Sequence, residues 1–175
     1  MANVTVPRPA ASEFASYYQG YVSQVPDGNL LAGLEQQGRD TVKLLRGIDE
    51  KKAQHRYAEG KWSIREVVGH LIDTERVFMY RALTFARGDQ TSLPPFDENA
   101  WASTSNAGGR ALPELIAEFE AVRAATLTMF RGFGDAEFAR KGVANNNPFT
   151  VRAVAYIVAG HERHHVKILR ERYGV

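Results

Sequence analysis

The chain has 175 residues, of which 44% are hydrophobic and 24% are charged, and its formal net charge is +2. These values exclude wholesale disorder, collagen-like repeats and a membrane protein as classes. The length suits one continuous core, so we expect a single domain over residues 1–175, with residues 1–11 as a loose N-terminal arm.

Helix signals recur along the chain, whereas no segment shows the sustained alternation of β-branched residues that would indicate a sheet. A first, short helix is expected near residues 12–25. The turn Pro26-Asp27-Gly28 then leads to a second helix at about residues 30–47.

The third helix is the clearest, because Ser63 and Glu66 form the S-x-x-E pattern of a capping box just before a long apolar period. This helix is expected to run to about Arg87, and Gly88 follows its end. Residues 89–111 are rich in Pro, Asn, Ser and Gly, which indicates a long crossover loop.

Pro113 stands where the first turn of a helix tolerates proline, and the apolar period after it carries a fourth long helix to about Arg131. A second irregular stretch covers residues 132–149. Thr150 can cap the last helix, which runs to Gly174. The expected fold is all-α: a four-helix bundle with long crossover loops and a short extra N-terminal helix.

Three of the five histidines fall in the last helix, in the run His161-Glu162-Arg163-His164-His165. Positions 161 and 165 differ by roughly 40° around a helix and by about 6 Å along it, so both imidazoles can face one point. They continue the apolar stripe of this helix, whereas His164 points about 100° away from His165. Histidines on a core-facing surface need a partner.

His70 has a similar setting on the third helix, where Val67, Thr74 and Phe78 flank it on the same face. Three imidazoles could therefore converge on one divalent metal ion. Since the sequence contains no cysteine, a metal site has to use His, Asp or Glu. The alternative is that each histidine is a hydrogen-bonded core residue.

Two acidic residues accompany the histidines. Asp73 could hydrogen-bond an imidazole or a water molecule, or it could be a surface acid paired with Arg76. Glu162 could act as a general base, because the run also satisfies the H-E-x-x-H pattern of zinc peptidases. Those peptidases take a third ligand downstream, where only ten residues follow His165 here. Di-iron bundles need a second Glu-x-x-His motif, and Val67 stands where that glutamate would be.

The segment KWSIREVVGHLIDTE at residues 61–75, followed by H-x-x-H-H at residues 161–165, resembles the DinB-like superfamily, including its YfiT-type metal-dependent hydrolases. The resemblance covers nearly the whole chain. It implies a DinB-type bundle, commonly homodimeric, that holds Zn, Ni, Fe or Mn on His70, His161 and His165. The superfamily also contains S-transferases that use a low-molecular-weight thiol as cosubstrate.

Two reactions follow from this resemblance. A divalent metal on neutral histidines can activate a water molecule for hydrolysis or a thiol for transfer to an electrophile. We favour a metal-dependent hydrolase, because Glu162 or Asp73 could take the proton from water. The alternatives are a metal-dependent thiol S-transferase and a non-enzymatic metal-binding stress-response module.

Partners and location follow from patterning of charge and hydropathy. No apolar run reaches the roughly 18 residues that cross a bilayer, and the first residues lack the apolar stretch of a signal peptide. Lys and Arg are scattered among nearly as many acids, without a basic face for nucleic acid. We expect a cytoplasmic protein with a small-molecule substrate and with neither nucleic acid nor membrane as partner.

Overall fold

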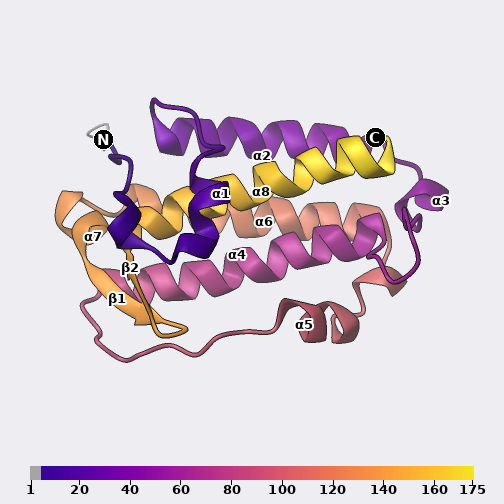
Figure 1. The fold of residues 1–175 in the computed structure, drawn as a ribbon. Helices are drawn as coiled ribbons and strands as arrows, with labels where there is room; N and C mark the ends of the chain where they lie inside the picture. Colours follow the sequence, from indigo (N-terminus) through magenta and orange to yellow (C-terminus); the bar gives the residue numbers. More distant parts are fainter. Residues whose placement is uncertain (1–4) are drawn as a thin grey trace.

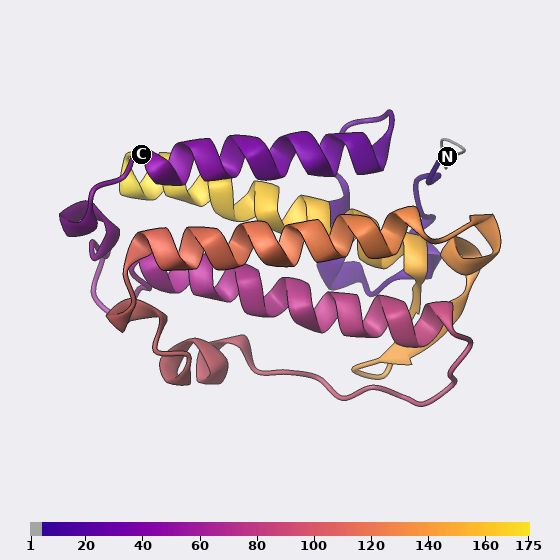
Figure 2. The same ribbon diagram turned by 180° about the vertical axis from the view of Figure 1, so that it is seen from behind.

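Four long helices form a bundle in the computed structural model, which describes residues 5–175 (Figure 1). The helices are α2 (Leu30–Arg46), α4 (Ile64–Ala86), α6 (Leu112–Arg131) and α8 (Val151–Tyr173). α2 and α8 run in one direction and α4 and α6 in the other, and each helix packs against two neighbours in the order α2, α6, α4, α8 (Figure 2). Because α4 and α6 are parallel, the chain between them returns along the whole bundle. The predicted four-helix bundle with long crossover connections is confirmed.

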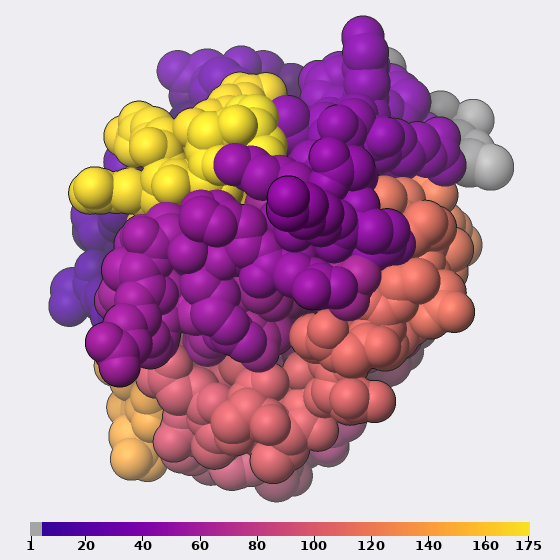
Figure 3. Space-filling model, turned by 90° about the vertical axis from the view of Figure 1, so that its right-hand side faces the viewer, coloured from indigo at the N-terminus to yellow at the C-terminus, as the bar shows by residue number. Residues whose placement is uncertain are grey.

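Short elements occupy the connections. They are η1 (Ala11–Glu13), η2 (Ser16–Tyr18), α1 (Gln19–Val22), α3 (Glu50–Ala53), α5 (Glu98–Thr104), η3 (Ala107–Gly109), α7 (Asp135–Ala139), β1 (Lys141–Ala144) and β2 (Asn147–Thr150). The extra N-terminal helix is thus three short turns rather than one helix, because Phe14 has an extended backbone and its ring enters the core. Figure 3 shows the end of the bundle, where the connection between α2 and α4 lies beside the C-terminal turns of α8.

The structure contains the capping hydrogen bonds that were expected at the helix ends. The Ser63 hydroxyl accepts from the Glu66 backbone N–H, and the Glu66 carboxylate accepts from the Ser63 backbone N–H at 2.6 Å. Thr150 caps α8 by accepting from the Ala153 backbone N–H. Gly174 ends α8 in the left-handed conformation, with φ of 66°. The Ser63, Glu66 and Thr150 side chains satisfy backbone N–H donors that a helix start leaves free.

A two-stranded antiparallel hairpin, β1 and β2, lies in the stretch that the sequence analysis expected to be irregular. Asn145 and Asn146 form its turn with φ of 48° and 57°, the positive values that a tight hairpin turn requires. Gly142 faces Phe85, whose ring occupies the space that a Cβ would need. The expectation of no sheet was wrong here, because strands of four residues are too short for alternation to be visible.

The N-terminal arm predicted over residues 1–11 lies partly outside the described residues. From residue 5 onward most of the arm is exposed, but it contacts the bundle at two points. Val6 is buried in the core, and the Arg8 guanidinium donates to the backbone oxygens of Val22 at 2.9 Å and Val25 at 2.5 Å. None of the helices within residues 5–175 combines the length and the hydropathy that a bilayer crossing requires.

The core consists of two apolar clusters, one at each end of the bundle. The first includes Phe78, Phe85, Phe130 and Ile157, and the second includes Val68, Leu115, Phe119 and Leu169. Each such side chain stabilises the fold by about 1.5–3 kcal/mol when it is removed from water.

A layer of buried polar side chains separates the two clusters. All four long helices contribute to this polar layer, which contains Gln37, Thr41, His70, Thr74, Glu75, Arg123, Thr126, His161, Glu162 and His165. Buried polar groups cost free energy unless they find partners, so the layer has to satisfy its own hydrogen bonds or bind something that does.

Gly160 lets the N-terminal segment approach α8 beside the polar layer. A Cβ at this position would overlap the backbone carbonyl of Tyr21, whereas nothing lies within 4 Å of a Cβ at Gly33 in α2. We expect Gly160→Ala to destabilise the protein by roughly 1–3 kcal/mol, because backbone has to move. Gly33→Ala, the matched control, should be neutral or stabilising by up to about 1 kcal/mol. Urea unfolding measures both; similar effects would contradict the close approach.

Candidate metal centre

Three histidine side chains meet between α4 and α8 in the polar layer. His70 comes from α4, and His161 and His165 come from successive turns of α8; they are 5%, 6% and 9% exposed. The Nε2 atom of His161 lies 3.0 Å from Nε2 of His70 and 3.1 Å from Nε2 of His165. The ligand atoms of all three side chains lie within 4.8 Å of one another. The structure therefore brings together the three residues that the sequence analysis selected.

The mutual geometry of these nitrogens fits a shared cation better than a set of hydrogen bonds. A neutral imidazole nitrogen either carries one hydrogen or offers one lone pair, so His161 cannot both donate to one neighbour and accept from the other through Nε2. In a tetrahedral site with Zn–N distances of 2.0–2.1 Å, two ligand nitrogens lie about 3.3 Å apart. The observed separations of 3.0 and 3.1 Å are close to that value.

Burial keeps the three imidazoles neutral. It lowers the pKa of His70 to about 4 and holds the pKa values of His161 and His165 well below the usual 6.5. The Thr74 hydroxyl lies 3.3 Å from Nδ1 of His70, which can direct the lone pair of Nε2 toward the other histidines. Histidine binds a metal ion through a ring nitrogen that carries no proton, so neutral imidazoles are the form that a metal site requires.

Stability of the metal-free protein should depend on pH in a defined window. Below about pH 6.5 the three histidines become protonated in the unfolded state, whereas they stay neutral in the folded state because their pKa values are lowered. The unfolded state then binds more protons, so the free energy of unfolding falls as the pH falls. For His70 this loss continues down to its folded pKa of about 4.

Urea unfolding in EDTA between pH 7.5 and 4.5 measures this loss. His161→Gln removes one of the three histidines with a lowered pKa, so the free energy of unfolding of this variant should depend less steeply on pH. A stability that stays constant from pH 6.5 to pH 5 would contradict neutral, buried imidazoles.

Aromatic rings surround the histidines. The Trp62 ring centroid lies 4.7 Å from that of His70, and the Tyr21 ring packs edge-on against His161 at 5.4 Å and against His164 at 5.2 Å. Trp62 directly precedes the helix cap Ser63 in the sequence, whereas nothing local in the sequence pointed to Tyr21. These contacts restrict the orientation of the rings.

A pocket of about 240 Å³ leads to His165 from outside. Its wall is mainly aromatic and apolar, with polar side chains from Lys61, Asn99 and His165; the other lining residues are Tyr57, Gly60, Trp62, Val67, Ile168 and Tyr173. Tyr57 and Tyr173 pack edge-on with ring centroids 5.0 Å apart. A small molecule could reach the side of the centre formed by His165 through this pocket.

Glu162 faces away from this pocket, into the rest of the polar layer. Its carboxylate forms an ion pair with Arg123 at 2.8 Å, accepts from the Thr41 hydroxyl at 2.5 Å and accepts from the Gln37 amide. Arg123 also donates two hydrogen bonds to the Glu75 carboxylate, at 3.0 and 2.8 Å. One buried arginine thus holds two carboxylates in the centre of the bundle.

Asp73 lies among surface charges rather than among the histidines. It is half-buried, and burial raises the pKa of its carboxyl group. Its charged neighbours are Arg76, whose guanidinium lies 3.8 Å away, together with Arg110 and Glu118. This is the surface-acid arrangement that the sequence analysis weighed against a role at the metal.

Comparisons with known proteins identify the family of the chain. The sequence model of the DinB superfamily matches residues 33–169. Among relatives, a protein of Geobacillus kaustophilus named "Putative metal-dependent hydrolase" is 27% identical over 142 residues, covering 77% of this chain and 79% of the relative. One of Geobacillus thermodenitrificans with the same name is 25% identical over 135 residues, covering 73% and 75%.

Two solved structures share the fold. YfiT from Bacillus subtilis, described as "a probable metal-dependent hydrolase with an unusual four-helix bundle topology", superposes with a TM-score of 0.69 and 18% identity, covering 96% of this chain and 94% of YfiT. A mycothiol-dependent maleylpyruvate isomerase gives a TM-score of 0.66 and 12% identity, covering 83% of this chain and 61% of the isomerase.

Proposed function

Because the chain belongs to the DinB superfamily, we propose that it is a metal-dependent hydrolase of a small molecule, with one divalent metal ion on His70, His161 and His165. The observation that carries the proposal is the convergence of three buried, neutral Nε2 atoms. A divalent metal on three histidines supplies a water molecule of lowered pKa and polarises a carbonyl. The names of the two Geobacillus relatives support the same reaction class.

The residues around the centre would then have separate tasks. Thr74 and Trp62 fix the orientation of His70, and Tyr21 excludes water from the side of His161 that faces the N-terminal segment. The aromatic pocket beside His165 would admit the substrate. Asp73 and Glu162 were the predicted proton acceptors. The Glu162 carboxylate is already engaged in an ion pair with Arg123 and in hydrogen bonds from Thr41 and Gln37.

We further propose that Glu162 holds α8 in place and does not act as a general base. Glu162→Gln should therefore leave turnover of the metal-loaded enzyme within about tenfold of the wild type, whereas loss of a general base costs roughly 10²–10⁴-fold. The pH profile of turnover and the urea midpoint separate the two roles. A loss of more than a hundredfold in a variant that is still folded would restore Glu162 as the base.

The function is tested by screening the metal-loaded protein against amides, esters and electrophiles. The screen is run with and without a low-molecular-weight thiol, beside His165→Ala. Hydrolysis that needs the histidine and no thiol supports the proposal. Turnover that requires a thiol would instead favour S-transfer, the candidate suggested by the shared fold of the mycothiol-dependent isomerase.

The metal's identity, the oligomeric state and the location rest on the resemblance and on sequence patterning. Zinc, nickel, iron and manganese all suit three neutral nitrogens to differing degrees. The homodimer and the cytoplasmic location stay predictions, and light scattering that gives a mass near 19.5 kDa at every concentration would remove the first of them.

A further inference from the structure

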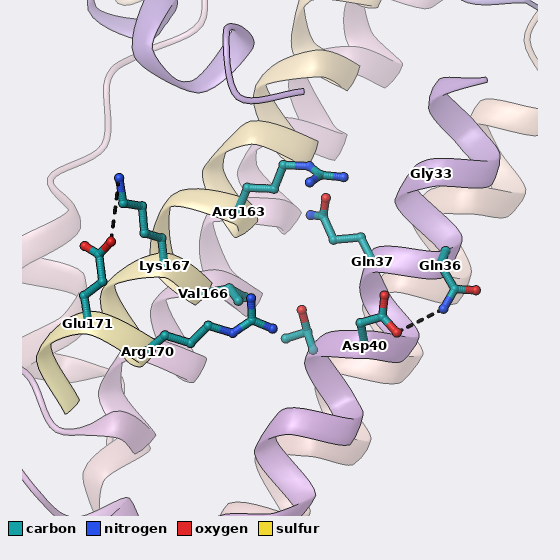
Figure 4. A pocket seen from close by; sticks show the side chains of 10 residues that line it. Gly33, Gln36, Gln37, Asp40, Arg163, Val166, Lys167, Arg170 and Glu171 are labelled. Atoms are coloured by element: carbon teal, nitrogen blue, oxygen red, sulfur yellow. Dashed lines mark hydrogen bonds and ion pairs between the residues drawn. The ribbon is translucent and has the colours of Figure 1, made fainter. Parts of the chain in front are cut away.

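A second and larger cavity lies on the other side of α8. This groove of about 590 Å³ runs between α2 and α8 (Figure 4), and we call it the α2–α8 groove. Its lining residues are Gly33, Gln36, Gln37, Asp40, Thr41, Arg163, Val166, Lys167, Arg170 and Glu171. None of the three clustered histidines lines it, so the groove is separate from the candidate metal centre.

Two arginines of the groove have no carboxylate partner. Figure 4 shows the side chains of Arg163 and Arg170 extending from α8 toward α2, while Lys167 turns to the Glu171 carboxylate 3.8 Å away. Within residues 5–175, no carboxylate lies within 4.0 Å of the guanidinium of Arg163 or Arg170. The Asp40 carboxylate on the opposite wall accepts a hydrogen bond from the Gln36 amide at 3.0 Å. The groove therefore presents two positive charges from one helix.

A buried amide oxygen faces the same space. Gln37 is only 8% exposed, and its Nε2 atom donates to the Ala159 backbone oxygen at 3.0 Å and to Glu162. These two acceptors fix the orientation of the amide, so the oxygen Oε1 has to point the other way. In Figure 4 it points toward the Arg163 guanidinium.

Both of these groups lack a hydrogen-bond partner. Oε1 of Gln37 and Nε of Arg163 are buried atoms without one in the described part of the chain. Leaving a buried polar atom unpaired costs about 1–3 kcal/mol. The groove thus contains one acceptor and one donor that a bound molecule could satisfy at the same time.

We propose that the α2–α8 groove binds a small organic anion that carries both a phosphate or carboxylate group and a hydroxyl group. The anionic group accepts hydrogen bonds from Arg163 and Arg170, which suit phosphate and carboxylate geometry. The hydroxyl donates to Oε1 of Gln37 and accepts from Nε of Arg163, because a hydroxyl group can do both. The volume lies within the range typical of small-molecule sites.

Chemical-shift mapping of the full-length, metal-loaded protein, ¹⁵N-labelled and in low-salt buffer, tests the proposal. The probes are glucose 6-phosphate, gluconate, inorganic phosphate and glucose, so that the two anionic groups and the hydroxyl are varied separately. We expect glucose 6-phosphate or gluconate to shift amides of residues 33–41 and 163–171. Inorganic phosphate should bind at least about tenfold more weakly, because it has no hydroxyl group apart from its charged group, and glucose should not bind, because it carries no charge.

Charge-matched variants decide whether the binding is local. Arg163→Gln and Arg170→Gln should each weaken binding at least about tenfold. Arg172→Gln, an exposed arginine of the same helix outside the groove, should leave it unchanged. Equal weakening in all three, shifts centred on Trp62 and His165, or no binding at millimolar concentration would each overturn the proposal.

Discussion

His161→Ala is expected to lower the affinity for a divalent metal by more than about 100-fold, and to abolish the proposed hydrolysis with it. Changes to groups that merely support a ligand cost 10–100-fold, so the loss of a ligand should cost more. His161 is the residue to change because its Nε2 atom is the one that contacts both other nitrogens, at 3.0 and 3.1 Å. Metal content after dialysis and competition with a chelator measure the change.

His164→Ala is the matched control for this variant. It removes the same side chain from the same helix, but His164 is not part of the cluster. The protein with His164→Ala should retain about one metal per chain, as the wild type should. If both variants bind metal equally well, the buried histidines are not the ligands.

Arg123→Met is expected to destabilise the protein by roughly 3–5 kcal/mol, the cost of leaving buried charges without their partner. The Arg123 side chain is 5% exposed and holds the carboxylates of Glu75 and Glu162, each within 2.8 Å. Methionine keeps most of the volume, so the loss reports charge rather than a cavity. Since whole domains are stable by only about 5–15 kcal/mol, the urea midpoint should fall markedly.

Two further variants give this prediction its controls. Adding Glu75→Gln and Glu162→Gln to Arg123→Met should recover at least about half of the lost stability, because no buried charge is then left unpaired. Arg46→Ala breaks an exposed ion pair with Glu120 and should cost no more than about 1 kcal/mol. A loss of that small size for Arg123→Met would show that the interior at Arg123 is well hydrated.

The four long helices were predictable because their ends carry strong local signals. Ser63 and Thr150 cap helix starts through hydrogen bonds that depend only on residues three positions away. The crossover residues gave weaker signals. Asp97 caps α5, yet the helix has only seven residues and follows a proline pair, so composition alone indicated a loop. The hairpin turn at Asn145 and Asn146 depends on positive φ values, which asparagine tolerates but does not require.

The histidine cluster could be predicted from the sequence, whereas Arg123 in the same polar layer was missed. His161 and His165 are recognisable by their spacing and because histidine is rare in this chain. A signal for Arg123 also existed. Arg123 lies four residues after Phe119 and four before Leu127, on the buried stripe of α6. A charge on such a stripe predicts a buried partner. Its pairing with both Glu75 and Glu162 is decided by helix packing that no local pattern encodes.

The two contacts that define the cluster differ greatly in separation along the chain. His161 and His165 are one turn apart, whereas His70 and His161 are 91 residues apart. A bound ion would therefore act as a reversible cross-link across a long loop, and it could form only after α8 has docked on α4. During synthesis α8 emerges after the other three long helices, so the ion could not guide their assembly. At a concentration a thousandfold above its dissociation constant, it would add about 4 kcal/mol to the finished bundle. Metal supply would thus govern how long a folded molecule survives rather than how quickly it forms.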